Sequence, residues 1–422
     1  MIKFSNYYKF TILFILIYIS FLRSPYIFLN GRFFSLDTKY YVYALSQSFL
    51  DTLLFIEIST GYINLISNLS SLIAANFFTL KFAPYCPVYI SFFVLIVIFS
   101  IILFKDSFLF QKDFQKILGA FIFLITPPFV FEVWLNVINL QVYLGLLTFI
   151  LLFVKFNNKY DIFIYPPIIF ISGLSGIYSC LTFPFFLIRY LKNRNLINLI
   201  NFISIFLPTL IQLLITFYSK TADLLHPGPL SFTFSFFEIV SYTYNSIIQT
   251  FLGGSFPNFI MSLFSINIDS VLSNKNHLIF TVIFSILILI IIFIIFFKLF
   301  LKVLTKLDQD NIITLTLIVF FIEVSIFVII GGLNDSIQGR YSVIPGATLL
   351  LLTLHLVKQY KQNFFSKFLF LILCVAFITG IYDFRYKKYI HYFDCINCSD
   401  WKIEVDKYEK DNNYKLKSWP YN

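Results

Sequence analysis

Acidic and basic side chains are scarce in this chain, and several of them follow its first long apolar run. The segment 30–62, NGRFFSLDTKYYVYALSQSFLDTLLFIEISTGY, contains Asp37 and Glu57. A carboxylate there can take a proton from a substrate hydroxyl, a general-base role worth about 10²–10⁴-fold in rate. Arg340 lies near the other end of the chain. A guanidinium can neutralise a departing phosphate through paired, charge-assisted hydrogen bonds.

Asp37 and Arg340 share a sequence environment. Each lies a few residues from an apolar run, and each has aromatic neighbours, such as Phe33 beside Asp37 and Tyr341 beside Arg340. A half-buried charge at a membrane boundary needs a partner. One acid and one arginine on the same outer face are the minimum set for moving a sugar from a lipid-linked phosphate donor. Asp37 is therefore predicted to be the general base, and Arg340 to hold the donor phosphate.

The composition predicts an all-α polytopic membrane protein. The chain has 422 residues, of which 59% are hydrophobic and 12% are charged, with a mean hydropathy of +0.84. A soluble domain carries about 25% charged residues. Apolar runs recur along the whole chain and indicate about eleven transmembrane helices, whereas a β-barrel would show alternating segments of about ten residues. The net charge of +10 is explained by basic residues on cytoplasmic turns, so nucleic acid is not an expected partner.

The positions of Lys and Arg predict the topology. Lys3 and Lys9 place the N-terminus in the cytoplasm, and Phe10–Leu29 is read as a retained first helix rather than a cleaved signal peptide. The outer segments are then the first outer loop, the second outer loop and the tail: 30–62, 219–276 and 385–422. Residues 1–384 form one transmembrane domain in this scheme, and the tail is a short extracytoplasmic extension.

The remaining helices follow from the same pattern. Those with clear bounds are Ala83–Phe104, Ile117–Leu135, Leu196–Tyr218, Leu278–Phe297, Ile312–Ile330 and Phe368–Asp383. Gly61–Phe78 is only moderately apolar and is predicted to be a helix that lies in the interface or inserts shallowly. Residues 162–187 contain several prolines and glycines. They are predicted to form two short or broken helices that meet at GLSG, residues 173–176.

Further polar and aromatic residues are expected on the same outer face. The substrate-binding candidates are Glu57, Tyr62, Glu132, Asn139, Gln141 and Tyr341. Each has a structural alternative: helix capping for Glu132, satisfaction of turn backbone for Asn139 and Gln141, and interfacial anchoring for Tyr62. In the tail, Cys395 and Cys398 form a C-x-x-C. If the tail is extracytoplasmic, a disulfide or a free thiol pair is favoured over zinc, which needs two more ligands.

Four short motifs together resemble the GT-C class of membrane-embedded glycosyltransferases, in particular uncharacterised bacterial members. They are FFSLDTKYY (33–41), GYINLISNLSSL (61–72), FEVWLNVINLQVYL (131–144) and IQGRYSVIP (337–345). The Trp-containing tail (400–420) is also similar. The resemblance implies a multi-pass protein of the bacterial cell membrane and a polyprenyl-phosphate sugar donor. The acceptor would be a cell-envelope glycan, a glycolipid or a protein.

Two positions depart from that pattern. Leu36 stands where a second acid is expected, and Asn68 stands where an arginine follows GY. The single carboxylate disfavours a mechanism with two acids and a divalent metal, so base catalysis by Asp37 without a cofactor is expected. An inactive relative, a flippase or transporter for lipid-linked oligosaccharides, and a polysaccharide polymerase are the alternatives. A transporter would place polar groups at mid-membrane on several helices, and a polymerase would carry several arginines in a large outer loop.

Overall fold

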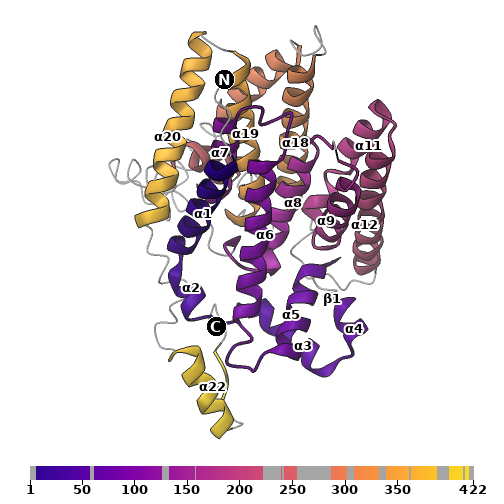
Figure 1. Cartoon of the computed structure of the whole chain (residues 1–422), viewed down its shortest axis with the longest axis vertical. Helices are drawn as coiled ribbons and strands as arrows, with labels where there is room; N and C mark the ends of the chain where they lie inside the picture. The colour runs from indigo at the N-terminus through magenta and orange to yellow at the C-terminus, as the bar shows by residue number, and fades with distance from the viewer. Residues whose placement is uncertain are drawn as a thin grey trace, which may run out of the picture. The chain divides into compact units, whose positions relative to one another are not determined.

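The computed structural model describes residues 6–57, 61–125, 133–156, 158–221, 239, 242–253, 287–301, 308–331, 339–360, 363–386, 399–411 and 414–417. Figure 1 shows the described helices, coloured along the chain. The chain forms two compact units. Unit 1 contains Met1–Lys105, Phe131–Leu224 and Lys387–Asn422, and unit 2 contains Asp106–Val130 and Leu225–Tyr386. The C-terminal tail therefore belongs to the same unit as the first outer loop.

The fold is all-α, as the sequence predicts. Within the described ranges, the only strands are β1 (Ile56–Glu57) and β2 (Tyr62–Ile63), which pair with each other. Among the residues that the structure describes, five helices are long and apolar enough to cross a membrane: Tyr85–Phe104, Leu196–Ser219, Gln309–Ile329, Arg340–Gln359 and Phe364–Asp383. Shorter apolar helices are Leu65–Phe77, Ile138–Leu151, Asp161–Leu174 and Leu287–Leu301. The count of about eleven crossings remains a prediction.

The first apolar run is broken rather than continuous. The sequence predicts one helix over Phe10–Leu29, but the structure has α1 (Asn6–Arg23) followed by α2 (Pro25–Leu29). Ser24 lies between them with φ −154° and ψ 73°. A residue that precedes proline is pushed out of the helical region by the proline ring, which explains the break.

Two short helices and a two-stranded hairpin occupy the first outer loop. After α3 (Ser35–Ser46) and α4 (Phe49–Leu53) come β1 and β2, in register with Glu57 opposite Tyr62. The helix predicted over Gly61–Phe78 starts later than expected, as α5 (Leu65–Phe77), because residues 62–63 form a strand. Both α3 and α4 pack on α5.

Helix α6 (Tyr85–Phe104) is a membrane-length helix of unit 1. Its 20 residues correspond to about 30 Å, the thickness of the hydrocarbon core of a bilayer. At its start, the Tyr85 hydroxyl donates to the carbonyl of Leu29 at 2.7 Å. Just past its end, Lys105 forms an ion pair with Asp161 at 3.2 Å. The segment that leads into α3 and the Lys105 cluster therefore lie at opposite ends of α6.

The second part of unit 1 is a layer of helices. They are η3 (Ile138–Leu140), α8 (Gln141–Leu151), α9 (Asp161–Leu174), α10 (Ile177–Cys180), α11 (Phe183–Lys192) and α12 (Leu196–Thr221). The predicted break at GLSG is confirmed, because α9 ends at Leu174 and α10 begins at Ile177. Helices α9 and α12 pack closely where Gly173 faces Pro208, and a Cβ on Gly173 would lie 2.6 Å from the proline Cβ.

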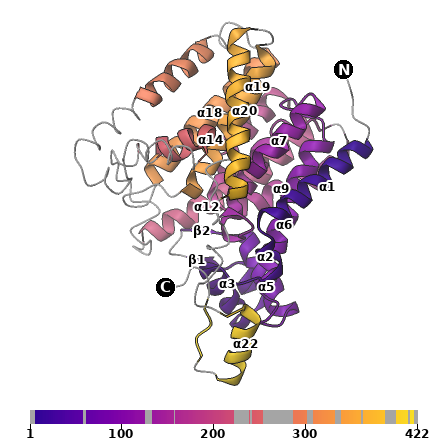
Figure 2. The ribbon, with the colours of Figure 1, turned by 90° about the vertical axis from the view of Figure 1, so that its left-hand side faces the viewer.

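The tail ends unit 1 with α22 (Trp401–Lys410). Figure 2 shows this yellow helix beside the indigo and violet segments α2, α3 and α5. Buried Trp401 and Val405 share a core cluster with Phe33 and Tyr41 of the first outer loop. The sequence predicts that Trp401 packs the tail onto the membrane face or its outer loops, and the structure confirms packing on the first outer loop.

Unit 2 is built around a deeply buried helix, α19 (Val343–Gln359). Its neighbours are α7 (Asp113–Ile125), α18 (Gln309–Gly331), η4 (Thr243–Ile248), η5 (Gly339–Ser342), α14 (Gln249–Leu252) and α20 (Phe364–Tyr386). The sequence predicts a helix over Ile117–Leu135, whereas α7 ends at Ile125 and Leu135 is not helical. Glu132 lies outside the described residues.

Candidate functional site

Asp37 occupies the third position of α3, and its side chain is buried, with 5% of its surface exposed. The backbone N–H of Phe34, which precedes α3, donates to the carboxylate. This contact is half of a capping box. Atom Oδ1 has no hydrogen-bond partner among the described residues. Burial raises the pKa of Asp37 to about 7, and the hydrogen bond from Phe34 partly opposes the shift. One oxygen of this carboxylate is therefore buried without a hydrogen bond from the described residues.

Tyr40 links Asp37 to the hairpin. It lies one turn further along α3, and its ring meets Phe55 edge-on, with the centroids 5.3 Å apart. Burial raises the pKa of Tyr40 well above its ordinary range, and Tyr62, Glu57 and Asp37 each raise it further. Charges on all three groups therefore act on the Tyr40 hydroxyl, so the fold gathers these predicted site residues around one phenol.

Gln141 extends this cluster to the GLSG turn. Its Nε2 donates to the Tyr62 hydroxyl at 2.9 Å. Its side chain also lies against Gly176, where an added Cβ would be 2.4 Å from both Cβ and Oε1 of Gln141. Gly176 has φ +151°, which side chains of L-residues rarely adopt. Only glycine therefore fits at this point of the turn, and it fixes the direction of Gln141.

Two residues of α12 hold the hairpin from the other side. Gln212 accepts from the N–H of Ile63 at 3.0 Å and donates to its carbonyl at 2.9 Å. The Thr216 hydroxyl donates to the carbonyl of Gly61 at 2.6 Å. The sequence analysis did not single out Gln212 or Thr216. Gln212 could have been singled out, because an amide inside an apolar run needs hydrogen-bond partners within the protein.

Asn68 has a structural role at the position where the resemblance expects an arginine. It is 1% exposed, and its Nδ2 donates to the carbonyls of Leu53 at 2.9 Å and Phe55 at 2.8 Å. These bonds anchor the chain between α4 and β1 on α5. Asn68 therefore positions the segment that carries Glu57.

Asn139 lies buried in η3, directly before α8. The backbone of this turn is held by α5, because Asn64 Nδ2 donates to the carbonyl of Ile138 at 3.0 Å and the Ser67 hydroxyl donates to that of Val137 at 3.3 Å. The turn is thus fastened to the same helix that supports the first outer loop. Asn64 and Ser67 also escaped the sequence analysis.

Arg23 is a further buried residue that was not predicted from the sequence. It is 6% exposed at the end of α1, and its guanidinium lies 3.9 Å from the centroid of Trp134. The next residue, Leu135, has φ 51°, a strained value for a side chain of this size. The signal was present, since an arginine at the end of an apolar run must find an internal environment or reach the interface.

Arg340 and Tyr341 belong to unit 2, in η5. The Arg340 guanidinium lies 5.0 Å from the centroid of the Tyr341 ring and donates to its hydroxyl at 3.3 Å. Asp37 is in unit 1, so a cavity shared by Asp37 and Arg340 remains a prediction. Cys395 and Cys398 lie outside the described residues. Within the described part of the chain, no group of three or more His, Cys, Asp and Glu could hold a metal ion.

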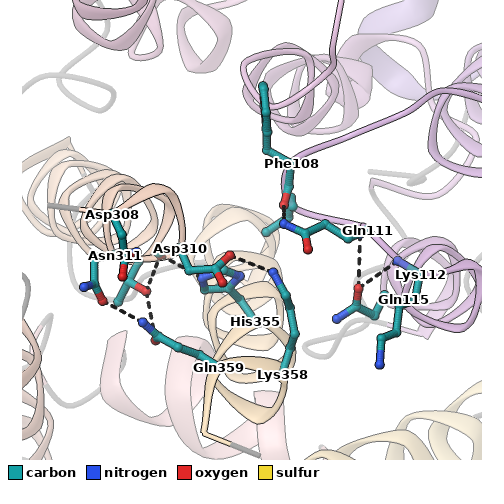
Figure 3. Close-up of polar contacts among 12 residues, drawn as sticks. Phe108, Gln111, Lys112, Gln115, Asp308, Asp310, Asn311, His355, Lys358 and Gln359 are labelled. Atoms are coloured by element: carbon teal, nitrogen blue, oxygen red, sulfur yellow. Dashed lines mark hydrogen bonds and ion pairs between the residues drawn. The ribbon is translucent and has the colours of Figure 1, made fainter. Parts of the chain in front are cut away.

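Unit 2 has a polar cluster of its own, between α18 and α19 (Figure 3). Lys358 pairs with Asp310 at 2.6 Å, and His355 Nε2 contacts the carbonyl of Asp310 at 3.0 Å. Gln359 donates to the Asn311 side chain at 2.6 Å. These contacts join the start of α18 to the end of α19, which indicates a structural role.

No family model matches the chain, and neither a curated protein nor a solved structure matches it. The functional interpretation therefore depends on the residues themselves.

Proposed function

We propose that the protein is a membrane glycosyltransferase that moves a sugar from a polyprenyl-phosphate donor to a glycan, glycolipid or protein acceptor. The observation that carries the proposal is the Asp37 carboxylate, which is buried and has one oxygen without a partner in the described part of the chain. A buried acid with a pKa of about 7 can accept a proton near neutral pH and release it again. A carboxylate that only capped a helix would not need this environment.

The chemistry follows from the types of groups present. Asp37 takes the proton of the acceptor hydroxyl as that oxygen bonds to the anomeric carbon of the donor sugar. The bond between the anomeric carbon and the phosphate oxygen breaks, and the electron pair leaves with the phosphate. Arg340 offsets the charge that develops there. Tyr62 and Gln141 form a hydrogen-bonded pair beside Glu57, and such polar groups suit sugar hydroxyls.

The proposal includes a topology. The N-terminus lies in the cytoplasm, about eleven helices cross a bacterial cell membrane, and the first outer loop and the tail lie outside. The five long apolar helices and the membrane-length separation along α6 support the arrangement. Cysteine-accessibility labelling of Lys39→Cys and Lys112→Cys would test it. The proposal requires labelling from the outside for the first variant and from the inside for the second.

The direct test is sugar transfer by purified protein in vesicles that contain labelled polyprenyl-phosphate sugars. We expect Asp37→Asn to lower the rate by about 10²–10⁴-fold while the protein level stays normal. Asp51→Asn is the matched control, because Asp51 lies in the same loop but is exposed. Equal transfer by wild type and Asp37→Asn would refute the assignment of the base.

A further inference from the structure

The tail helix α22 contacts the residues directly before α3. Trp401 is buried, its Nε1 donates to the carbonyl of Leu80 at 2.9 Å, and its ring meets Phe33 edge-on with the centroids 5.7 Å apart. On its other side, Phe33 lies 4.8 Å from the Tyr41 ring. Phe33 is thus packed between the tail and α3, and aromatic contacts of this kind stabilise beyond the area that they bury.

Arg32 joins both ends of the tail helix to the same segment. One guanidinium nitrogen donates to the carbonyl of Lys417, and the other donates to that of Ser399, each at 2.5 Å. Ser399 precedes α22 and Lys417 follows it, so a single side chain contacts the described tail on both sides of this helix. The guanidinium also lies 5.6 Å from the centroid of the Trp401 ring.

Contacts within the tail hold the carbonyls of Ser399 and Lys417 near each other. Glu404 is 1% exposed and accepts from the Ser399 hydroxyl at 3.2 Å and from the N–H of Lys417 at 3.3 Å. This buried carboxylate draws the two flanks of α22 together. The ion pair of Lys81 with Asp406 at 2.6 Å lies at the surface, where such pairs contribute little.

We infer that the tail is a positioning element for Asp37, with Trp401 and Arg32 as positioning residues that act through Phe33 and Phe34. Phe33 is held by the tail, and the next residue supplies the N–H that donates to the Asp37 carboxylate. A shift of residues 33–34 would therefore reorient that carboxylate and admit water around it. The catalytic consequence depends on the proposed function, whereas the coupling between tail and carboxylate does not.

Burial and the N–H of Phe34 determine the pKa of Asp37. Asp37 also acts on Tyr40 of the same helix, which Glu57 and Tyr62 of the hairpin influence as well. Helix α4, which packs on α3, carries Asp51, whose side chain is exposed. Helix α5, which packs on α3, has no ionisable side chain. Replacing Trp401 changes no charge. A changed titration of Asp37 in such a variant therefore reports a changed position and not a new electrostatic partner.

The experiment follows the Asp37 carboxyl in the full-length protein by infrared difference spectroscopy across pH, with the band assigned by its loss in Asp37→Asn. We expect Trp401→Ala to lower the titration midpoint by about one pH unit or more, because entering water weakens the desolvation that raises it. Trp401→Phe keeps a ring but loses the N–H, so we expect its Asp37 midpoint to lie between those of wild type and Trp401→Ala. Lys410→Ala, on the exposed side of α22, is the matched control and should leave the midpoint unchanged.

The inference would be overturned if the tail of Trp401→Ala became sensitive to protease while the titration midpoint of Asp37 stayed unchanged. If Trp401→Ala does not fold, an unchanged midpoint in Trp401→Phe with a protease-sensitive tail would overturn it equally. In the transfer assay, we expect Trp401→Ala to lower kcat by about tenfold with little change in KM, as misplacement of a reacting group does. Asp37→Asn could keep full transfer while the Asp37 midpoint still shifts in Trp401→Ala. In that case the base assignment fails and the positioning role stands.

Discussion

Two buried aspartates of unit 1 lie near opposite ends of α6 and differ in their partners. Asp161 is 3% exposed, and both of its oxygens are used: Lys105 contacts Oδ1 at 3.2 Å, and the N–H of Asn158 donates to Oδ2 at 3.1 Å. Asp37 is equally buried, yet its Oδ1 has no partner among the described residues. Burial alone therefore does not mark a working acid. Asp37 differs from Asp161 in being buried without full pairing among the described residues, which costs stability.

Arg189, at the basic end of unit 1, has partners for its buried guanidinium. Arg189 donates to the carbonyls of Leu151, Leu152 and Val154, and its guanidinium stacks on Phe156. Those carbonyls end α8, where the helix has no internal donors left. The guanidinium of Arg189 is thus used for structure, as is the carboxylate of Asp161. Asp37 Oδ1 has no hydrogen-bond partner among the described residues.

The largest expected effect is the difference in sugar-transfer rate between Asp37→Asn and Asp161→Asn. Asp37→Asn should lower sugar transfer by about 10²–10⁴-fold, because the amide cannot take a proton. Asp161→Asn should leave transfer per folded molecule within about twofold, since Asp161 has no role near the substrate and only its ion pair is lost. Transfer rates divided by the folded fraction from size-exclusion chromatography measure both. Equal losses in the two variants would remove the functional distinction between them.

The pH dependence of sugar transfer is expected to depend on Asp37 and not on Asp161. The base must be ionised, and burial raises the pKa of Asp37 to about 7, so the rate should fall about tenfold for each pH unit below that value and level off above it. Initial rates between pH 5 and 9 in wild type and Asp161→Asn give the profile. The two profiles should coincide. A plateau that extends down to pH 5 would show that Asp37 is not the titrating base.

Gly176→Ala tests whether the glycine turn positions the polar groups around Asp37. The added Cβ would lie 2.4 Å from Gln141, and the φ of +151° is strained for alanine, at a cost of about 1–3 kcal/mol. Gln141 should move away from Tyr62, and transfer should fall by about tenfold or more. Gly31→Ala is a milder comparison, since its Cβ would meet the Tyr85 ring at 3.1 Å. Equal activities of both variants and wild type would contradict a role for the turn.

The smallest expected effect is on stability. Asp161→Asn weakens the contact with Lys105, whose side chain is 38% exposed, so we expect a loss of only about 1 kcal/mol in the free energy of unfolding. Asp37→Asn should instead be stabilising relative to wild type, increasingly as pH rises. The folded-state pKa of Asp37, about 7, exceeds the ordinary value of 3.8, so wild type loses stability as pH rises between the two. Thermal unfolding at pH 5 and pH 8 measures both variants, and a pH-independent difference for Asp37→Asn would contradict the assignment of the raised pKa.

Local sequence determined most of the helices. Apolar runs close to twenty residues long predict α6, α12, α18 and α20, because a run of that length can bury its surface only in a bilayer or against other helices. The break at GLSG was also predictable, since Gly176 adopts a backbone conformation that other residues avoid. Pro25 could have predicted the break at Ser24. The continuous apolar run around it instead led to the prediction of one helix.

Only the tertiary structure decided which polar groups are paired. Sequence spacing does not show that Gln212 holds β2, that Asn68 anchors the loop before Glu57, or that Arg32 binds the tail more than 360 residues away. Buried polar groups find partners through the fold, whatever their separation along the chain. The sequence by itself thus singled out Asp37 as an acid near a membrane boundary. The packing of α3, the hairpin and the tail made it a buried acid with an open oxygen, because burial and pairing are properties of the surroundings and not of the residue.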